Sequence, residues 1–379
     1  MKEYSERPRV WRFLMTVAVP VWKYFNVHAD DCQVEGPCLI VSNHVSAWDP
    51  VFLTRCFRRK PVHYVASEHL FRNGLMSKIL NYAVSPIARR KASGAADTGL
   101  TCLRRLRAGH NVGLFAEGEA SWDGANIDIF PATGKMARTS GATLVTCRIE
   151  GAYLTVPRWT KKIRRGRINC RVVGVYPPEQ LKKMKPDEIT QLINRDIHED
   201  AWERQKQEHV RFKAKNRAEG IETGYYICPS CRGIGTVKGE GDMVRCGCGF
   251  EVFYSEEGFL EPAEPFETLR QWNLWQEETF AAMDFEPGQL MFSDEGMSLR
   301  LLDDKHGQQQ IDTGSLCQYP ESLSCGEHSF KLDEINDMSM VKRNILLFTV
   351  GENYYEIRSE NSCCMRKYIA AWKRFSAEK

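Results

Sequence analysis

Residues 38–50 read CLIVSNHVSAWDP, an apolar run followed at once by polar residues. The run CLIV at 38–41 has the length and composition of a strand that is buried on both faces. His44 and Asp49 follow it, five positions apart. A neutral imidazole accepts a proton near pH 7, and a nearby carboxylate fixes its tautomer. The pair is a candidate base with its orienting acid, and an aspartate near a histidine in a purely structural role is the alternative.

Short apolar runs alternate with helical patterns from residue 38 to residue 175. Alternation of this kind predicts an α/β fold with much parallel pairing. In such sheets, ligands bind where the carboxyl ends of the strands open into loops, so the polar residues that end these strands form the candidate site. Strands are expected at 38–42, 62–66, 82–88, 111–116, 143–149 and 168–175, and helices at 49–58, 69–80, 95–108, 131–140 and 186–210.

Two further segments place polar groups where an apolar strand stops. SPIARR at 85–90 ends in arginines, and LFAEGEASWDG at 114–124 begins with an apolar pair. Taken in order with NHVSAWD at 43–49 and FPATGKMARTSGATLVTCRI at 130–149, these blocks resemble the 1-acylglycerol-3-phosphate acyltransferase (lysophospholipid acyltransferase) family. The resemblance covers residues 10–210 and depends on the combination of blocks.

The resemblance implies a glycerolipid-acyltransferase-type sheet with flanking helices and an O-acyltransferase activity. His44 would take the proton of an acceptor hydroxyl, and Asp49 would orient His44. The hydroxyl of a lysophospholipid of the 1-acylglycerol-3-phosphate type would attack an acyl thioester directly, giving phosphatidic acid. The expected donor is acyl-CoA or acyl-carrier protein, with acyl phosphate as the alternative that the sequence leaves open, and no catalytic cofactor is expected. The expected substrate-binding residues are Asn43, Arg89 (for the acceptor phosphate), Glu117, Gly118 and Arg158.

The third block departs from the family's E-G-T-R-S-like pattern, because Glu119-Ala120 replaces Thr-Arg. A cation near the acceptor phosphate is lost, and a charge-assisted hydrogen bond is worth about 1.5–3 kcal/mol. Either Arg148, Arg158 or the basic run RWTKKIRRGR at 158–167 replaces this cation, or the acceptor is not a simple lysophosphatidate. The basic run is also compatible with a solvated turn or a membrane-surface patch.

The N-terminal segment, residues 1–30, is expected at a membrane surface. Its uncharged stretch FLMTVAVPVW at 13–22 is ten residues long and contains Pro20, whereas a spanning helix needs about 20 apolar residues. Aromatic residues and Arg or Lys flank the stretch, which suits an anionic membrane surface. An ordinary buried helix is the alternative.

The charge is divided unevenly along the 379 residues. Residues 1–220 contain 37 Lys and Arg against 22 Asp and Glu, a net charge of +15, whereas residues 221–379 contain 15 against 27, a net charge of −12. A basic half predicts an anionic partner. Apart from the four at 228–248, the 14 cysteines are scattered along the chain, which indicates reduced thiols and a cytosolic setting. Together with the basic half, this predicts a cytoplasmic protein that is peripheral on the inner face of the membrane.

A cysteine cluster lies in CPSCRGIGTVKGEGDMVRCGCG at 228–249. The cysteines follow the pattern C-x2-C, then fourteen residues, then C-x-C, and this pattern resembles that of a zinc ribbon. Four thiolates form the closed arrangement of structural zinc sites. A set of thiols without metal is the alternative. Only three of these 22 residues are Lys or Arg, so no nucleic-acid partner is expected. The predicted zinc ligands are Cys228, Cys231, Cys246 and Cys248.

The remaining segments complete a five-part organisation. A linker helix is expected within 256–287, and the short alternating runs of 288–379, closed by the helical pattern MRKYIAAWKRF, predict a mostly-β domain capped by a helix. This last part weakly resembles a pleckstrin-homology or GRAM-type module. The expected domains are 1–30 (membrane-surface segment), 31–220 (acyltransferase), 221–255 (zinc ribbon), 256–287 (linker) and 288–379 (β domain).

Two other functions remain open at this stage. The Glu119-Ala120 replacement is compatible with a zinc-ribbon adaptor that keeps an acyltransferase scaffold with weak or no activity. It is also compatible with an acyltransferase whose acceptor is a glycolipid or an aminoacyl lipid.

Overall fold

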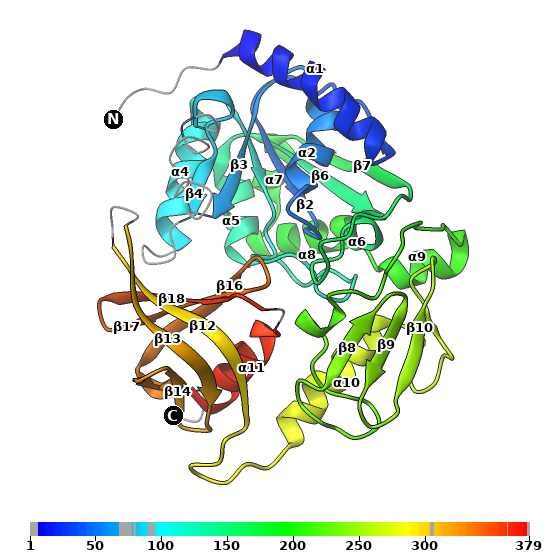
Figure 1. The fold of residues 1–379 in the computed structure, drawn as a ribbon. Helices are drawn as coiled ribbons and strands as arrows, with labels where there is room; N and C mark the ends of the chain where they lie inside the picture. The colour runs from blue at the N-terminus through cyan, green and yellow to red at the C-terminus, as the bar shows by residue number, and fades with distance from the viewer. Residues whose placement is uncertain are drawn as a thin grey trace. The chain divides into compact units, whose positions relative to one another are not determined.

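The computed structural model describes residues 7–67, 78, 81–89, 95–303, 307–361 and 363–376 (Figure 1). The chain forms two compact units. The first consists of Met1–Pro157 and Arg164–Lys213, and the second consists of Arg158–Ile163 and Ala214–Lys379.

The first unit contains a seven-stranded sheet with the strand order β1-β7-β6-β2-β5-β3-β4. Neighbouring strands are parallel except for β6 and β7, which are antiparallel. The prediction of an α/β fold with a largely parallel sheet is therefore confirmed. The strands are β1 Val27–Ala29, β2 Cys38–Ser42, β3 Val62–Ser67, β4 Ile87–Arg89, β5 Asn111–Leu114, β6 Thr143–Glu150 and β7 Ile168–Tyr176.

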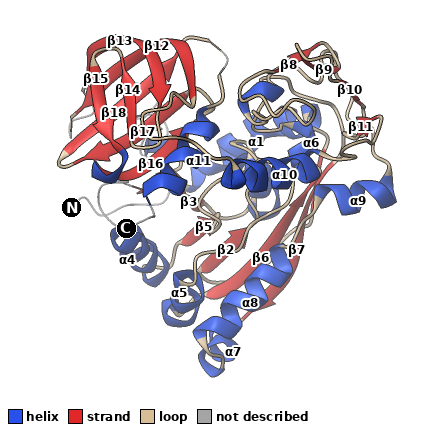
Figure 2. Cartoon of the chain, turned by 90° about the horizontal axis from the view of Figure 1, so that it is seen from below, coloured by secondary structure: helices blue, strands red, loops and turns tan. Residues whose placement is uncertain are grey.

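Helices cover both faces of this sheet. Figure 2 shows α5 and α8 side by side on one face, where Ile189 and Ile193 pack in one cluster with Leu39 of β2. Elsewhere in the unit, the rings of Phe25 and Phe52 lie 5.1 Å apart, which joins the end of α1 to α2. The helices are α1 Pro8–Tyr24, α2 Asp49–Thr54, α4 Ala95–Arg107, α5 Ala132–Ser140, α6 Ala152–Thr155, α7 Pro178–Lys183, α8 Pro186–Ile197 and α9 Ala201–Glu208, with a 3₁₀ turn at Arg55–Phe57.

Strand β2 lies in the middle of the sheet, and all five of its residues are buried. This burial explains its continuous apolar sequence, since a central parallel strand is covered on both faces. Among the described helices, none combines the length and the apolarity needed to cross a bilayer.

Two predicted elements near the start of this unit differ from the structure, and a third is not tested by it. The expected strand at 82–88 is wrong: the strand covers only Ile87–Arg89, since residues 81–83 are helical and Ser85 adopts a φ of 41° before Pro86. The expected helix at 49–58 is α-helical only to Thr54 and continues as the 3₁₀ turn. The expected helix at 69–80 lies outside the described residues except for residue 78.

The expected helix at 186–210 is also wrong, because two helices replace it. Helix α8 ends at Ile197, and His198 and Asp200 are not helical. The Asp200 carboxylate accepts hydrogen bonds from the N–H groups of Trp202 and Glu203 and so starts α9. A capping side chain of this kind satisfies N–H groups that a helix start leaves without partners.

The second unit begins with a four-stranded antiparallel sheet in the order β11-β10-β9-β8. A helix follows it, within the stretch expected to be a linker. The Thr268 hydroxyl caps this helix by accepting the N–H of Gln271. The elements are a 3₁₀ turn at Ile221–Thr223, β8 Val237–Glu240, β9 Met243–Cys246, β10 Glu251–Tyr254, β11 Leu260–Glu261 and α10 Leu269–Ala282.

The rest of this unit is a seven-stranded antiparallel sheet in the order β15-β14-β13-β12-β18-β17-β16, followed by α11. The predicted mostly-β part with a closing helix is confirmed. Met365 and Tyr368 of α11 are buried with Leu299 and Leu346 in its core. The elements are β12 Phe292–Leu302, β13 Gln308–Gln318, β14 Ser322–Cys325, β15 His328–Lys331, a 3₁₀ turn at Leu332–Glu334, β16 Ile335–Val341, β17 Ile345–Val350, β18 Asn353–Ser359 and α11 Met365–Ser376.

Candidate active site

The loop between β2 and α2 places a histidine beside a buried carboxylate. His44 Nδ1 lies 2.7 Å from Asp49 Oδ2. The His44 side chain keeps 24% of its surface exposed, whereas the Asp49 side chain is fully buried. The imidazole is therefore accessible, while the group that orients it is shielded from water.

Asp49 is itself held in place by the loop that it closes. Its Oδ2 accepts the N–H groups of Val45 at 2.6 Å and Ser46 at 2.9 Å, and its Oδ1 accepts the Ser46 hydroxyl at 2.7 Å. A buried carboxylate is stable only when hydrogen bonds satisfy it. The carboxylate is thus fixed in position independently of any bound substrate.

The third sequence block fixes the backbone of His44. The His44 N–H donates to Glu117 Oε1 at 2.7 Å, and the His44 carbonyl accepts the N–H of Ser121 at 2.9 Å. The second oxygen of Glu117 accepts the N–H of Ile127 at 3.1 Å. Burial raises the pKa of Glu117 to about 8, although these backbone N–H groups act in the opposite direction. Glu117 therefore joins two loops and lies below the surface.

Aromatic rings pack on the face of the candidate base. The His44 and Phe115 rings stack with their centroids 4.7 Å apart and an interplanar angle of 26°. On the Phe115 ring, Tyr64 stacks at 5.9 Å and 13°. The imidazole thus has one contact in its plane and another on its face.

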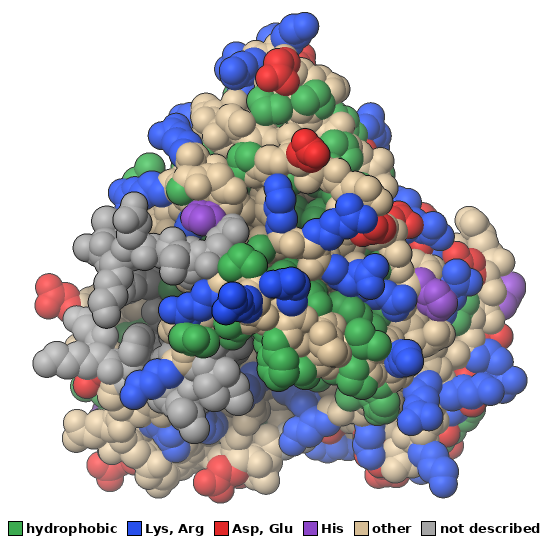
Figure 3. All heavy atoms as spheres, turned by 90° about the horizontal axis from the view of Figure 1, so that it is seen from above, with side chains coloured by type: hydrophobic (Ala, Val, Ile, Leu, Met, Phe, Trp, Pro, Cys, Tyr) green, Lys and Arg blue, Asp and Glu red, His purple; other side chains and the backbone are tan. Residues whose placement is uncertain are grey.

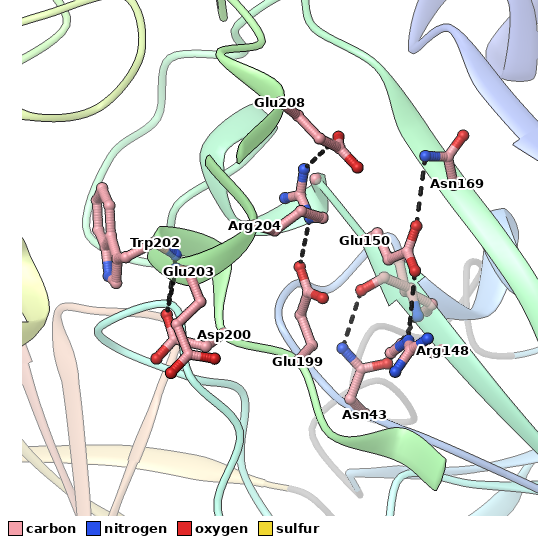
Figure 4. A network of polar contacts seen from close by, with 12 residues as sticks. Asn43, Arg148, Glu150, Asn169, Glu199, Asp200, Trp202, Glu203, Arg204 and Glu208 are labelled. Atoms are coloured by element: carbon pink, nitrogen blue, oxygen red, sulfur yellow. Dashed lines mark hydrogen bonds and ion pairs between the residues drawn. The ribbon is translucent and has the colours of Figure 1, made fainter. Parts of the chain in front are cut away.

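Asn43 connects the end of β2 to β6. It is fully buried; its amide donates to the Ile149 carbonyl at 2.9 Å and accepts the Ile149 N–H at 2.8 Å. Figure 4 shows the adjoining network, in which Glu150 lies between Arg148 and Asn169. Arg148 also donates to the carbonyl of His198 at 3.1 Å. Asn43 and Arg148 therefore both make contacts within the protein.

Arg89 brings the second block to the third. It is the last residue of β4, it is exposed, and its Nη1 donates to the Gly118 carbonyl at 3.2 Å. Gly118 has a φ of 88°, and a Cβ there would lie 2.7 Å from the Phe130 ring. Only glycine fits this position without strain. The Arg89 guanidinium lies 5.8 Å from the centroid of Phe130.

Contacts distant in sequence anchor the loop that follows the third block. The Tyr153 hydroxyl donates to the Trp122 carbonyl at 3.0 Å, and the Trp202 indole donates to the Asp123 carbonyl at 2.6 Å. Sequence reasoning missed Tyr153 and Trp202, because no short motif marks them. The sequence shows only that both are aromatic, which does not mark them as anchors of this loop.

The remaining predicted substrate-binding residue belongs to the other unit. Arg158 lies in the segment Arg158–Ile163, which is part of the second unit, whereas His44 belongs to the first. The structure places His44, Asp49, Asn43, Arg89, Glu117 and Gly118 in one unit. A role of Arg158 at this site stays a prediction.

The four predicted metal ligands lie together in the second unit. The sulfur atoms of Cys228, Cys231, Cys246 and Cys248 are all within 4.8 Å of one another, and the group could hold a metal ion. The Sγ atoms of Cys228 and Cys248 are 3.7 Å apart, and those of Cys231 and Cys246 are 3.8 Å apart. Tetrahedral zinc with Zn–S bonds of about 2.3 Å requires sulfur–sulfur distances of about 3.8 Å. The donor set and its spacing therefore fit a closed zinc site.

Two comparisons with known proteins match part of this chain. Residues 24–150 match the model of the family described as Acyltransferase. This stretch contains the loop of His44 and Asp49 and the third block, so the similarity to that family covers the candidate site. Among solved structures, the 1-acyl-sn-glycerophosphate (LPA) acyltransferase PlsC from Thermotoga maritima is similar at 16% sequence identity, over 50% of this chain and 77% of that chain, with a TM-score of 0.41.

Proposed function

We propose that this chain transfers a fatty acyl group from a thioester to the free hydroxyl of a lysophospholipid of the 1-acylglycerol-3-phosphate type, giving a phosphatidic acid. The observation that carries the proposal is the 2.7 Å contact between an accessible His44 ring and a buried Asp49. The family match over residues 24–150 supports acyl transfer as the reaction class.

In the proposed mechanism, Nδ1 of His44 donates its proton to Asp49 in a hydrogen bond, so Nε2 is the nitrogen that accepts a proton. Nε2 takes the hydroxyl proton as the acceptor oxygen attacks the thioester carbonyl. The new C–O bond forms, the C–S bond breaks, and the thiolate leaves with the proton that His44 returns. Asp49 stabilises the transient imidazolium without being protonated.

The acceptor phosphate is proposed to bind at Arg89. One of its five N–H donors is used on the Gly118 carbonyl, and a guanidinium suits phosphate recognition. Glu119, which replaces part of the usual Thr-Arg pair, is exposed in the same block. Because this position carries an anion where the family has a cation, other acceptors, including glycolipids and aminoacyl lipids, should also be tested. Lipid mass spectrometry would identify the products. An inactive scaffold would acylate none of them.

Thiol release from an acyl-thioester donor, measured with and without lysolipid, tests the reaction. We expect His44→Ala and Asp49→Asn to lower the lysolipid-dependent rate by about two to four decades, the usual worth of general base catalysis. The matched control is His28→Ala, which removes an exposed histidine on β1 of the same unit. Normal turnover by the His44 variant would refute the mechanism.

The proposed partner surface is α1. Phe13, Val17 and Tyr24 are 67%, 50% and 49% exposed on one side of this helix, and Arg9, Arg12 and Lys23 lie on the same helix. Figure 3 shows hydrophobic side chains among many Lys and Arg on this face of the molecule. Such a face suits peripheral binding to the anionic inner surface of the cytoplasmic membrane, and the same positive charge suits an acidic acyl-carrier protein.

The four-cysteine group is proposed to hold a structural zinc ion in a zinc ribbon. Four thiolates leave no open coordination position, so zinc there would stabilise the fold and take no part in the reaction. The seven-stranded antiparallel sheet with α11 is proposed as a pleckstrin-homology or GRAM-like module that binds a lipid or a protein partner.

A further inference from the structure

The contact between His44 and Asp49 does not by itself fix the imidazole plane. A single hydrogen bond at Nδ1 leaves the ring able to tilt about that bond, which would move Nε2 away from a bound hydroxyl. The stacked Phe115 ring, 4.7 Å away at 26°, lies on the face of the imidazole and restricts this tilt. Phe115 comes directly after β5 and two residues before Glu117, which holds the His44 N–H.

Phe115 is supported in turn by Tyr64 of β3. Their rings are nearly parallel, at 13°, with centroids 5.9 Å apart. Tyr64 lies against Gly113 of β5, where an added Cβ would come within 2.3 Å of the tyrosine ring. The Tyr64 hydroxyl is 3.2 Å from Thr54 Oγ1 of α2. The stack therefore contacts residues of two strands and a helix, which restrict the movement of its rings.

We propose that Phe115 is a positioning residue for the general base. It holds the imidazole plane so that Nδ1 stays on Asp49 while Nε2 faces the acceptor hydroxyl. Its ring face also attracts the imidazolium that forms as the proton is transferred, because an aromatic face carries partial negative charge. The inference rests on the proposed acyl transfer and adds a residue to the same site.

The test compares Phe115→Leu, which keeps apolar bulk without a ring face, with Phe115→Tyr, which keeps the ring. We expect Phe115→Leu to lower kcat roughly 2- to 30-fold, the range that a cation–π contact implies, with KM for both substrates unchanged within about twofold. Phe115→Tyr should restore most of the rate. Because imidazolium loses a favourable contact in the leucine variant, the acid limb of its pH–rate profile should move to lower pH.

A thermal melt of each variant checks folding, and Phe115→Met replaces Phe115→Leu if the leucine variant is unstable. A Phe115→Leu enzyme with full kcat, or equal losses in the leucine and tyrosine variants, would overturn the proposal. A rise in KM with unchanged kcat would also overturn it, since Phe115 would then contact substrate. The His44→Ala variant distinguishes a failure of the positioning role from a failure of the proposed acyl transfer. If His44→Ala is inactive while Phe115→Leu is fully active, the positioning role fails and the acyl transfer stands.

Discussion

The two units hold their candidate functional residues in opposite ways. In the first unit, the N–H of His44 is held by Glu117, which is 73 residues away in the sequence. In the second unit, Cys228 and Cys231 share one turn, Cys246 and Cys248 share another, and only fourteen residues separate the two pairs. The first arrangement depends on a whole sheet, whereas the second depends on two local turns that a metal ion can join.

The strand order explains how the first arrangement forms. Strand β2 is a parallel neighbour of β5, and β5 is a parallel neighbour of β3. Parallel neighbours end at the same edge of a sheet. Strand β4 is in turn a parallel neighbour of β3, and Arg89 is its last residue. The ends of β2, β5 and β4 therefore lie at the same edge of the sheet, and this edge carries His44, Phe115 and Arg89.

The largest expected effect comes from breaking the local arrangement. Cys228 directly follows Tyr226 and Ile227, which are buried in the same core as Leu299 of the antiparallel sheet. We expect Cys228→Ser to remove bound zinc and to lower the unfolding free energy of the second unit by at least about 3 kcal/mol, because structural zinc contributes about 10–16 kcal/mol in small zinc folds. Elemental analysis and hydrogen exchange resolved along the chain measure both quantities.

Cys317→Ser is the matched control, since Cys317 is a half-buried thiol in β13 of the same unit and lies outside the four-cysteine group. It should leave the zinc content unchanged. Loss of exchange protection throughout the first unit in Cys228→Ser would contradict the contrast between the units. Full zinc content in that variant would contradict the zinc site itself.

The same contrast decides what the sequence could predict. The four-cysteine group could be predicted because the spacing of the cysteines alone defines the site. The run CLIVS predicted β2 with its bounds, because a central strand is apolar throughout. The roles of Tyr153 and Trp202 as anchors of the third block could not be predicted, because their partners are backbone carbonyls 31 and 79 residues away. The sequence of β13, QQQIDTGSLCQ, does not predict a strand for another reason: it is mostly polar, and pairing on both sides makes it a strand.

A second test sharpens the description of the long-range arrangement through pH. Burial raises the pKa of Glu117 to about 8, from an ordinary value of 4.5. As pH rises from about 4.5 to 8, the unfolded chain releases a proton that the folded chain retains, so folding stability falls across this window. We expect a loss on the order of 3 kcal/mol from Glu117 between pH 5 and pH 8.

Urea denaturation at both pH values measures this loss, and Glu117→Gln should remove it because the amide does not titrate. Glu179→Gln, on an exposed residue of α7, should keep the wild-type dependence. If the Glu117→Gln variant shows the same slope as the unmodified protein, Glu117 is ionised in the folded state, and its two backbone contacts outweigh its burial.

The smallest expected effect concerns the difference in charge between the two halves of the chain. The basic half carries α1, whose exposed Phe13 would enter a lipid surface while nearby arginines approach anionic headgroups. Phe13→Glu removes apolar contact area and adds a repelled charge, so affinity for vesicles containing phosphatidylglycerol should fall about 10-fold.

Gln180→Glu on exposed α7 makes a similar charge change away from α1 and should have little effect. Vesicle co-sedimentation at two salt concentrations measures both, and equal losses in the two variants would mean that net charge, and not the exposed side of α1, determines binding.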